Sequence, residues 1–177
     1  MPRRKVTLIG LMGYARAGKD TAARHMPGWQ RLAFADPLKR DVLPFCSAFY
    51  HINPLNCDEA QKAVIRPIMV AHGRIMRDLD PDWWIDALAV DMRRLTPGLP
   101  AVITDCRYPN EARWVKGQGG VVVVIHRPSI GPANEEERAS IEEALCQRLH
   151  GAIVVNDGTP EELGPRVLEA AGAEAAA

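Results

Sequence analysis

The sequence predicts an α/β protein built on a five-stranded parallel sheet, and two observations support this. Five short apolar stretches alternate with segments whose apolar residues recur at helical spacing. The first apolar stretch also runs directly into a glycine-bounded loop that a helical pattern follows. Strands joined by helices in this way lie parallel, so a ligand is expected beyond their shared carboxyl edge. The expected strands cover residues 5–11, 31–35, 101–105, 121–125 and 152–155.

The loop after the first expected strand has the spacing of a phosphate-binding loop. Gly13 and Gly18 bound it and Lys19 follows. The glycines let successive backbone N–H groups point at phosphate oxygens, and the next helix adds its N-terminal N–H groups. Lys19 can reach the β- and γ-phosphates as a mobile charge. Asp20, with Thr21 behind it, stands where Ser or Thr usually binds Mg²⁺. A purely structural glycine loop is the alternative.

Helix starts are marked by capping residues and by proline in the first turn. Asp36 is expected to be an N-cap with Pro37 in the first turn, and Arg66 to lie at a helix N-terminal end, just before Pro67. Asn53 and Pro54 mark a turn within residues 46–65, the region whose secondary structure is hardest to predict. The helices are expected to begin at Lys19, Asp36, Asp58, Pro67, Asp80, Pro109, Asn134 and Thr159.

Composition and charge exclude several classes of protein. The 177 residues include 22 Lys and Arg against 22 Asp and Glu, which does not favour broad attraction to nucleic acid or anionic lipid. The apolar fraction of 47% argues against disorder, and no apolar run approaches a membrane span. Basic Met1–Lys5 precedes a short strand and not a signal peptide. Four cysteines without metal spacing suggest reduced thiols and a cytoplasmic location.

A second cationic group lies in the middle of the chain. Residues 61–77 contain Lys62, Arg66, Arg74 and Arg77 and no Asp or Glu. Arg74 and Arg77 are three apart and so are neighbours on one helix face. The planar guanidinium meets phosphate with two parallel hydrogen bonds, which favours a second anion site. The alternative interpretation is that these residues form a solvated basic face.

Further candidates follow the third and fourth expected strands. Asp105 could hold Mg²⁺ through water or orient a reacting phosphate, or it could cap the turn before Pro109. Arg107 and Glu111 could form an ion pair that aims the guanidinium at substrate.

Arg127 and Arg138 flank a loop rich in proline and glycine, which is typical of a lid, although a plain surface loop is equally compatible. Trp83 and Trp84 are expected to be core and groove wall.

Five segments together resemble the bacteriophage-type deoxynucleoside monophosphate kinases of the phosphate-loop (P-loop) superfamily. The Gly-Lys-Asp-Thr and Asp-x-Arg-x-Pro-Asn-Glu patterns are specific when they occur together, whereas either alone is not, and the family shares the Asp at position 20. Such proteins often carry a His-x-Ser-Glu-like segment after the lid, of which Ala139–Glu142 keeps only the Glu. Residues 156–163 are similar to the closing strand and helix of the family. The five segments are 13–21, 34–39, 73–77, 82–85 and 104–112.

The resemblance implies ATP-dependent phosphorylation of a deoxynucleoside 5′-monophosphate by a single domain, residues 1–177. Within it we expect a helical monophosphate-binding insertion over 36–98, a lid over 127–139 and a frayed tail over 173–177. ATP and Mg²⁺ are the expected cofactors and small nucleotides the partners, without nucleic acid or membrane, and a homodimer stays open. The alternatives are a kinase of another small substrate, such as dephospho-coenzyme A, and a nucleotide-binding switch or assembly ATPase.

The site residues fall into four groups under this interpretation. The catalytic candidates are Lys19, Asp105, Arg107, Arg127 and Arg138. The ATP contacts are Gly13, Ala15, Arg16, Ala17, Gly18, Lys19, Asp20, Thr21, Asn156 and Gly158. The monophosphate contacts are Asp36, Lys39, Arg66, Arg74, Arg77, Trp84, Arg107 and Glu111. The metal candidates are Asp20, Thr21 and Asp105.

Overall fold

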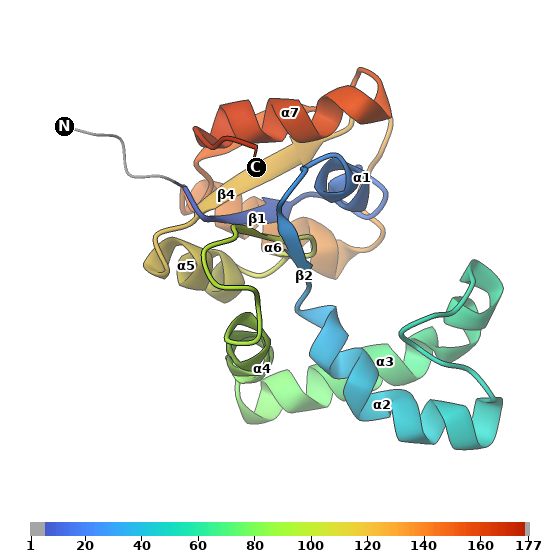
Figure 1. The fold of residues 1–177 in the computed structure, drawn as a ribbon. Coiled ribbons are helices and arrows are strands. Elements are labelled where there is room, and N and C mark those ends of the chain that lie inside the picture. Colours follow the sequence, from blue (N-terminus) through green and yellow to red (C-terminus); the bar gives the residue numbers. More distant parts are fainter. Residues whose placement is uncertain (1–5, 176–177) are drawn as a thin grey trace. The chain divides into compact units, whose positions relative to one another are not determined.

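The computed structural model describes residues 6–175 and divides the chain into two compact units (Figure 1). Residues up to Ala33 and from Leu95 onward form the first unit, and Phe34–Arg94 forms the second. Residues 95–98, which the sequence placed in the helical region, are part of the first unit. Within residues 6–175 no helix is both long and apolar enough to span a membrane.

The first unit contains the predicted five-stranded sheet, in the order β2-β3-β1-β4-β5. All neighbouring strands pair in parallel, so their carboxyl ends meet at one edge. Central β1 pairs on both sides, with Gly10 opposite Ile103 and Val122. The fold class is therefore confirmed. The strands are β1 (Leu8–Met12), β2 (Gln30–Leu32), β3 (Ala101–Ile103), β4 (Val121–His126) and β5 (Ala152–Val155).

Strand ends differ from the sequence prediction because pairing, and not apolar character alone, decides them. β2 ends at Leu32, since Ala35 is already helical, and β3 ends two residues before Asp105. The N–H of Thr104 still donates to the carbonyl of Leu32 at 3.0 Å, so the chain leaves the sheet just before the carboxylate. Lys5, the expected first residue of β1, lies outside the described residues.

Helices cover both faces of the sheet (Figure 1). α1 (Lys19–Arg24) and α7 (Pro160–Ala171) pack against each other on one face, over Ile9 and Leu11 of β1. α5 (Pro109–Gly117) lies on the opposite face, where Val115 would be 3.1 Å from a Cβ at Gly10. α6 (Glu135–Cys146) packs against α5.

The contact between α1 and α7 depends on Gly164. A Cβ there would lie 2.1 Å from the carbonyl oxygen of His25, at the C-terminal end of α1. The two backbones therefore approach more closely than any side chain would permit. This contact fixes the helix that follows the phosphate loop.

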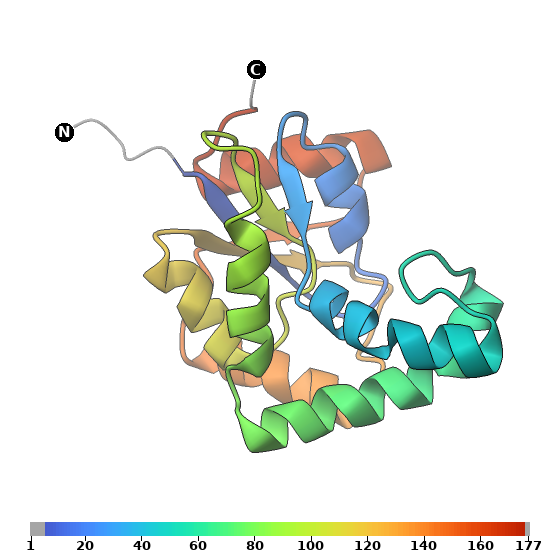
Figure 2. The ribbon, with the colours of Figure 1, turned by 60° about the horizontal axis from the view of Figure 1, so that its bottom comes forward.

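The second unit consists of α2 (Ala35–Tyr50), α3 (Glu59–Leu79) and α4 (Trp83–Met92), which pack pairwise (Figure 2). Its core contains Val42, Cys46, Ile52 and Ile65. Trp84 is buried, and its Nε1 donates to the carbonyl of Gly73 at 3.1 Å. Trp83 is 41% exposed, so only the second tryptophan is core.

Three expected helix starts in the second unit are wrong. Asp36 is not an N-cap, because α2 already begins at Ala35. α3 continues through Pro67, whose missing N–H removes one bond from a helix that starts at the Asp58–Gln61 capping box. Arg66 therefore lies inside the helix and not at its N-terminal end. α4 begins after Asp82, because Asp80 ends α3 and accepts the N–H of Asp82 at 2.9 Å.

Two helices of the first unit begin as the sequence predicted, and the chain end is partly anchored. Asn134 accepts the N–H of Glu137, and Thr159 forms a capping box with Glu162, as the sequence predicted. The expected frayed tail is anchored in part, because the carbonyl of Glu174 accepts a hydrogen bond from Nε1 of Trp29 at 3.1 Å. Residues 176–177 of that tail lie outside the described residues.

Candidate nucleotide-binding site

The loop between β1 and α1 has the backbone of a phosphate-binding loop. Gly13 (φ 141°) and Gly18 (φ 110°) both adopt conformations that side chains disfavour. A Cβ at Gly13 would also lie 2.3 Å from the carbonyl oxygen of Ile125. Between them, Arg16 has a left-handed backbone (φ 65°) and Ala17 closes a turn by donating its N–H to Tyr14 at 3.0 Å. The loop is thus tightly curled and requires both glycines.

Lys19 is held inside this loop. Its Nζ donates to the carbonyl oxygens of Gly13 at 2.6 Å and of Tyr14 at 2.8 Å, and the residue is only 7% exposed. Burial, followed by the positive charge of Arg107, lowers the pKa of Lys19 to about 8, against the opposing charges of Glu137, Asp20 and Asp105. A desolvated ammonium without a bonded carboxylate gains strongly from an arriving anion.

Asn156, after β5, braces the other side of the loop. Its Nδ2 donates to the carbonyl of Ala17 at 2.8 Å, and its N–H donates to the carbonyl of His126 at 2.7 Å. A Cβ at Gly18 would lie 2.5 Å from that Nδ2. Asn156 was predicted to contact ATP, and here it positions the loop while also lining the adjoining hollow.

A hollow of about 380 Å³ opens beside the loop. Four cationic side chains and a single carboxylate line it, so it attracts anions. Most of the predicted ATP contacts lie around it, including Gly158. The lining residues are Arg16, Gly18, Lys19, Asp20, Thr21, Arg24, Arg127, Asn156, Gly158 and Pro160.

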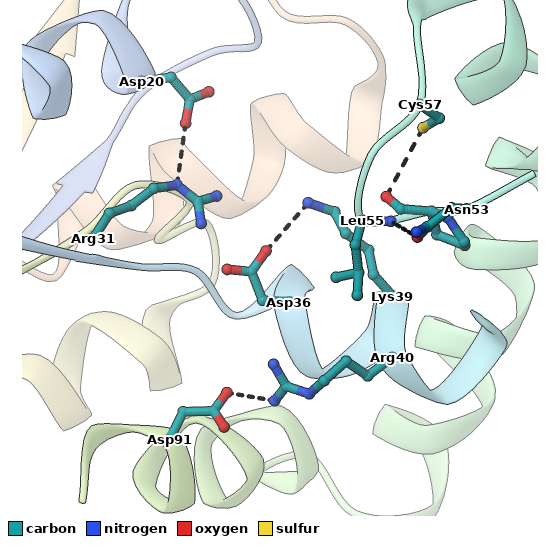
Figure 3. A network of polar contacts seen from close by, with 10 residues as sticks. Asp20, Arg31, Asp36, Lys39, Arg40, Asn53, Leu55, Cys57 and Asp91 are labelled. Carbon is teal, nitrogen blue, oxygen red and sulfur yellow. Dashed lines mark hydrogen bonds and ion pairs between the residues drawn. The ribbon is translucent and has the colours of Figure 1, made fainter. Parts of the chain in front are cut away.

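The carboxylate in this hollow belongs to Asp20, which pairs with Arg31 at 3.9 Å (Figure 3). Asp20 is in the first turn of α1, with its side chain 67% exposed. Asp105 acts on Lys19 through its charge, but it does not line the hollow. Within residues 6–175 no group of three or more His, Cys, Asp or Glu residues could hold a metal ion.

Glu111 contacts the backbone of the segment that carries Arg107. It is 3% exposed, and its Oε2 accepts the N–H groups of Arg107 at 2.7 Å and Tyr108 at 3.1 Å. The carboxylate therefore shapes the turn that carries Arg107, whose side chain is exposed. The sequence identified the pair of residues but not the atoms that meet.

The structure separates the two arginines predicted to flank a lid. Arg127 lines the hollow. Arg138 is held on the exposed surface of α6 by Glu135 and Glu142, and the hydrogen bond from Arg138 to Glu135 is the main cause of its raised pKa. Of the two, Arg127 lines the hollow and Arg138 does not.

The predicted monophosphate contacts, apart from Arg107 and Glu111, lie in the second unit. Lys39 pairs with Asp36 at 3.2 Å (Figure 3). Arg74 pairs with Asp78 at 3.8 Å, a carboxylate just beyond the stretch that lacks acidic residues. Arg77 donates to the carbonyl of Gly73 at 3.1 Å, the same oxygen that Trp84 uses. Arg66 is exposed on α3.

Sequence reasoning missed two residues at the phosphate loop. Arg24 lines the hollow and lies four residues after Asp20, so the shared helix face was a usable signal. Glu137 is 7% exposed, and its Oε1 accepts the N–H of Ala15 in the loop at 2.9 Å. It is one of three consecutive glutamates, and local sequence does not say which of them turns inward.

The chain is similar in sequence to a mimivirus protein along nearly its whole length. A protein of Acanthamoeba polyphaga mimivirus, named "Putative deoxynucleotide monophosphate kinase", is 26% identical over 189 residues, which cover 92% of this chain and 95% of that protein. The uncharacterized ORF77 protein of Ictalurid herpesvirus 1 is 32% identical over 104 residues, which cover 58% of this chain and 46% of that protein. No protein-family model matches.

Solved structures share the fold. TT1252 from Thermus thermophilus superposes with a TM-score of 0.54 at 18% identity, over 94% of this chain and 96% of that one. Dephospho-CoA kinase from Campylobacter jejuni gives 0.50 at 12% identity, over 92% and 94%. The chain therefore shares its fold with these structures, one of which is a kinase, and has a sequence relative in a mimivirus.

Proposed function

We propose that this protein is a kinase that transfers the γ-phosphoryl group of ATP to a deoxynucleoside 5′-monophosphate, giving the diphosphate and ADP. The observation that carries the proposal is the cationic hollow beside the phosphate loop, which the buried Lys19 helps to line. The acceptor is taken from the name of the mimivirus relative and from the sequence motifs.

On the donor side, the loop N–H groups and Lys19 would hold the β- and γ-phosphates. Arg127 would neutralise charge on the transferring group, since phosphoryl transfer leaves the protein mainly positioning and electrostatic work. Asp20 and Thr21 lie at the start of the same helix, in the hollow, and fit Mg²⁺ directly or through water. When bound, Mg²⁺ would supply positive charge that offsets the negative charge of the phosphates.

On the acceptor side, α3 offers arginines at a spacing that suits one phosphate. Arg74 and Arg77 lie within one turn, whereas Arg66 lies about 12 Å from Arg74 along the helix axis at about 1.5 Å per residue. Arg74 and Arg77 are thus better spaced to contact one phosphate together, and each guanidinium can make a two-pronged contact.

An ADP-release assay across the deoxynucleoside monophosphates tests the proposal. We expect ATP-dependent turnover with at least one of them and little without an acceptor. Dephospho-coenzyme A belongs in the same series, as a representative of other small acceptors. Hydrolysis of ATP at the same rate with and without every acceptor would indicate a nucleotide switch instead.

A further inference from the structure

Glu137 is a buried carboxylate that the proposed reaction leaves unused. It lies in the first turn of α6, where its own N–H donates to the N-cap Asn134 at 2.8 Å. Its Oε1 accepts the N–H of Ala15 at 2.9 Å, and its Oε2 accepts the N–H of Ala133 at 2.7 Å. Both oxygens thus accept backbone hydrogen bonds, which suits an ionised carboxylate because it has no proton to donate.

One of these two donors belongs to the phosphate loop. Ala15 lies between Gly13 and Gly18, among the N–H groups that bind phosphate oxygens in such loops. Glu137 also acts on Lys19 through its charge. The carboxylate therefore occupies a donor in the group that would hold the phosphates of a nucleotide.

We propose that Glu137 is a positioning residue that competes with the terminal phosphate of the donor for the N–H of Ala15, and so couples triphosphate binding to residues 127–134. The inference rests on the proposed function, since it takes a nucleoside triphosphate as the ligand of the loop. Two anions repel each other strongly where water is largely excluded. A phosphate at Ala15 therefore displaces the carboxylate.

Displacement has a second consequence, because the same side chain anchors Ala133. When Glu137 leaves the loop, Ala133 loses the acceptor of its N–H. The segment between β4 and α6, which begins with Arg127, is then freed to adjust to the donor. A diphosphate that does not reach Ala15 leaves both hydrogen bonds in place, so Glu137 distinguishes ATP from ADP.

Titration calorimetry of Glu137→Gln with ATP and with ADP tests the competition. The substitution keeps the size of the side chain, removes its charge and leaves one oxygen that can accept a backbone N–H. ATP affinity should rise on the order of tenfold, while ADP affinity changes by less than about threefold. Glu136→Gln is the matched control, because Glu136 is the preceding residue and accepts from Tyr108 Oη at 2.7 Å instead of from the loop. It should change neither affinity by more than about twofold.

A measurement on the unaltered protein decides the matter even where Glu137→Gln folds poorly. Amide hydrogen exchange at Ala133 should become faster with a non-hydrolysable ATP analogue and stay unchanged with ADP. Equal or weaker ATP binding by folded Glu137→Gln, or slower exchange at Ala133 with the analogue, would overturn the inference alone. Unaltered protein that binds neither ATP nor ADP would instead overturn the proposed function.

Discussion

At the scale of single residues, Lys19 combines burial with a positive charge, and its protonation is therefore linked to stability. Its pKa is about 8 in the folded protein against the ordinary value of 10.5. Between these values the unfolded chain holds a proton that the folded protein has lost. Low pH therefore favours unfolding, and this contribution to stability increases as pH rises from about 8 towards 10.5.

Comparison of Lys19→Met with the unaltered protein isolates this linkage. Below pH 8 the buried charge carries its full cost, so the substitution should stabilise the fold there. The difference in the free energy of unfolding should shrink by on the order of 2 kcal/mol between pH 7.5 and 10.5. Urea denaturation at several pH values measures it, and a pH-independent difference would contradict the burial argument. Phosphoryl transfer by Lys19→Met should be lost, because nothing replaces the ammonium at the β- and γ-phosphates.

Asp20 offers a second test at this scale, since it stands where a hydroxyl usually binds Mg²⁺. Asp20→Ser should keep measurable activity. Asp20→Ala should require several times more Mg²⁺ for half-maximal activity, because it loses an interaction with the ion worth roughly 1 kcal/mol. Asp157→Ala is the control, because Asp157 is an exposed carboxylate that pairs with Arg166 outside the hollow. An identical Mg²⁺ dependence in Asp20→Ala would leave Thr21 or Asp105 as the metal residue.

At the scale of secondary structure, the position of α1 depends on its backbone contact with α7. Gly164→Ala would place a methyl group 2.1 Å from the carbonyl of His25, and backbone cannot yield as a side chain does. We expect a loss of at least about 3 kcal/mol in the free energy of unfolding. Gly117→Ala, where a Cβ meets nothing within 4 Å, should be neutral or slightly stabilising. Urea denaturation of both variants measures the difference in their free energies of unfolding. Equal stability of the two variants would refute the prediction.

The elements also show what sequence could and could not predict. Strands, the phosphate loop and the starts at Asp58, Asn134 and Thr159 follow from local signals, namely apolar runs, glycines and capping side chains. The continuation of α3 through Pro67 does not, because packing of a 21-residue helix outweighs one missing hydrogen bond. The inward turn of Glu137 likewise depends on where α6 meets the loop.

At the scale of the whole molecule, the proposed binding of ATP and the proposed binding of the monophosphate involve residues of different compact units. Lys19 and the cationic hollow belong to the first unit, and the arginines of α3 belong to the second. Substitutions of residues that share no partners act independently to a good approximation. Variants of α3 should therefore change monophosphate binding and leave ATP binding nearly unaltered.

Titration calorimetry of Arg74→Ala and Arg77→Ala, with ATP and separately with each deoxynucleoside monophosphate, tests this division. Loss of a hydrogen bond to a charged group costs roughly 1.5–3 kcal/mol, so monophosphate affinity should fall on the order of tenfold to a hundredfold. Arg→Lys should restore only part of it, since an ammonium cannot make the two-pronged contact. Arg77→Ala also removes a bond to Gly73, so its thermal stability is measured alongside.

Arg94→Ala provides the control for this last prediction, because Arg94 is an exposed arginine of the same unit that pairs with Asp91 at 3.5 Å. It should leave both affinities unchanged, which separates a specific phosphate contact from a general loss of positive charge. Equal losses in Arg94→Ala and Arg74→Ala would mean that α3 attracts anions only diffusely. The acceptor-site proposal fails if unaltered protein binds ATP, binds no monophosphate and hydrolyses ATP alone. In that case the protein is a nucleotide switch. A hydrolase uses water as acceptor, so it has no need of a second site for a phosphate.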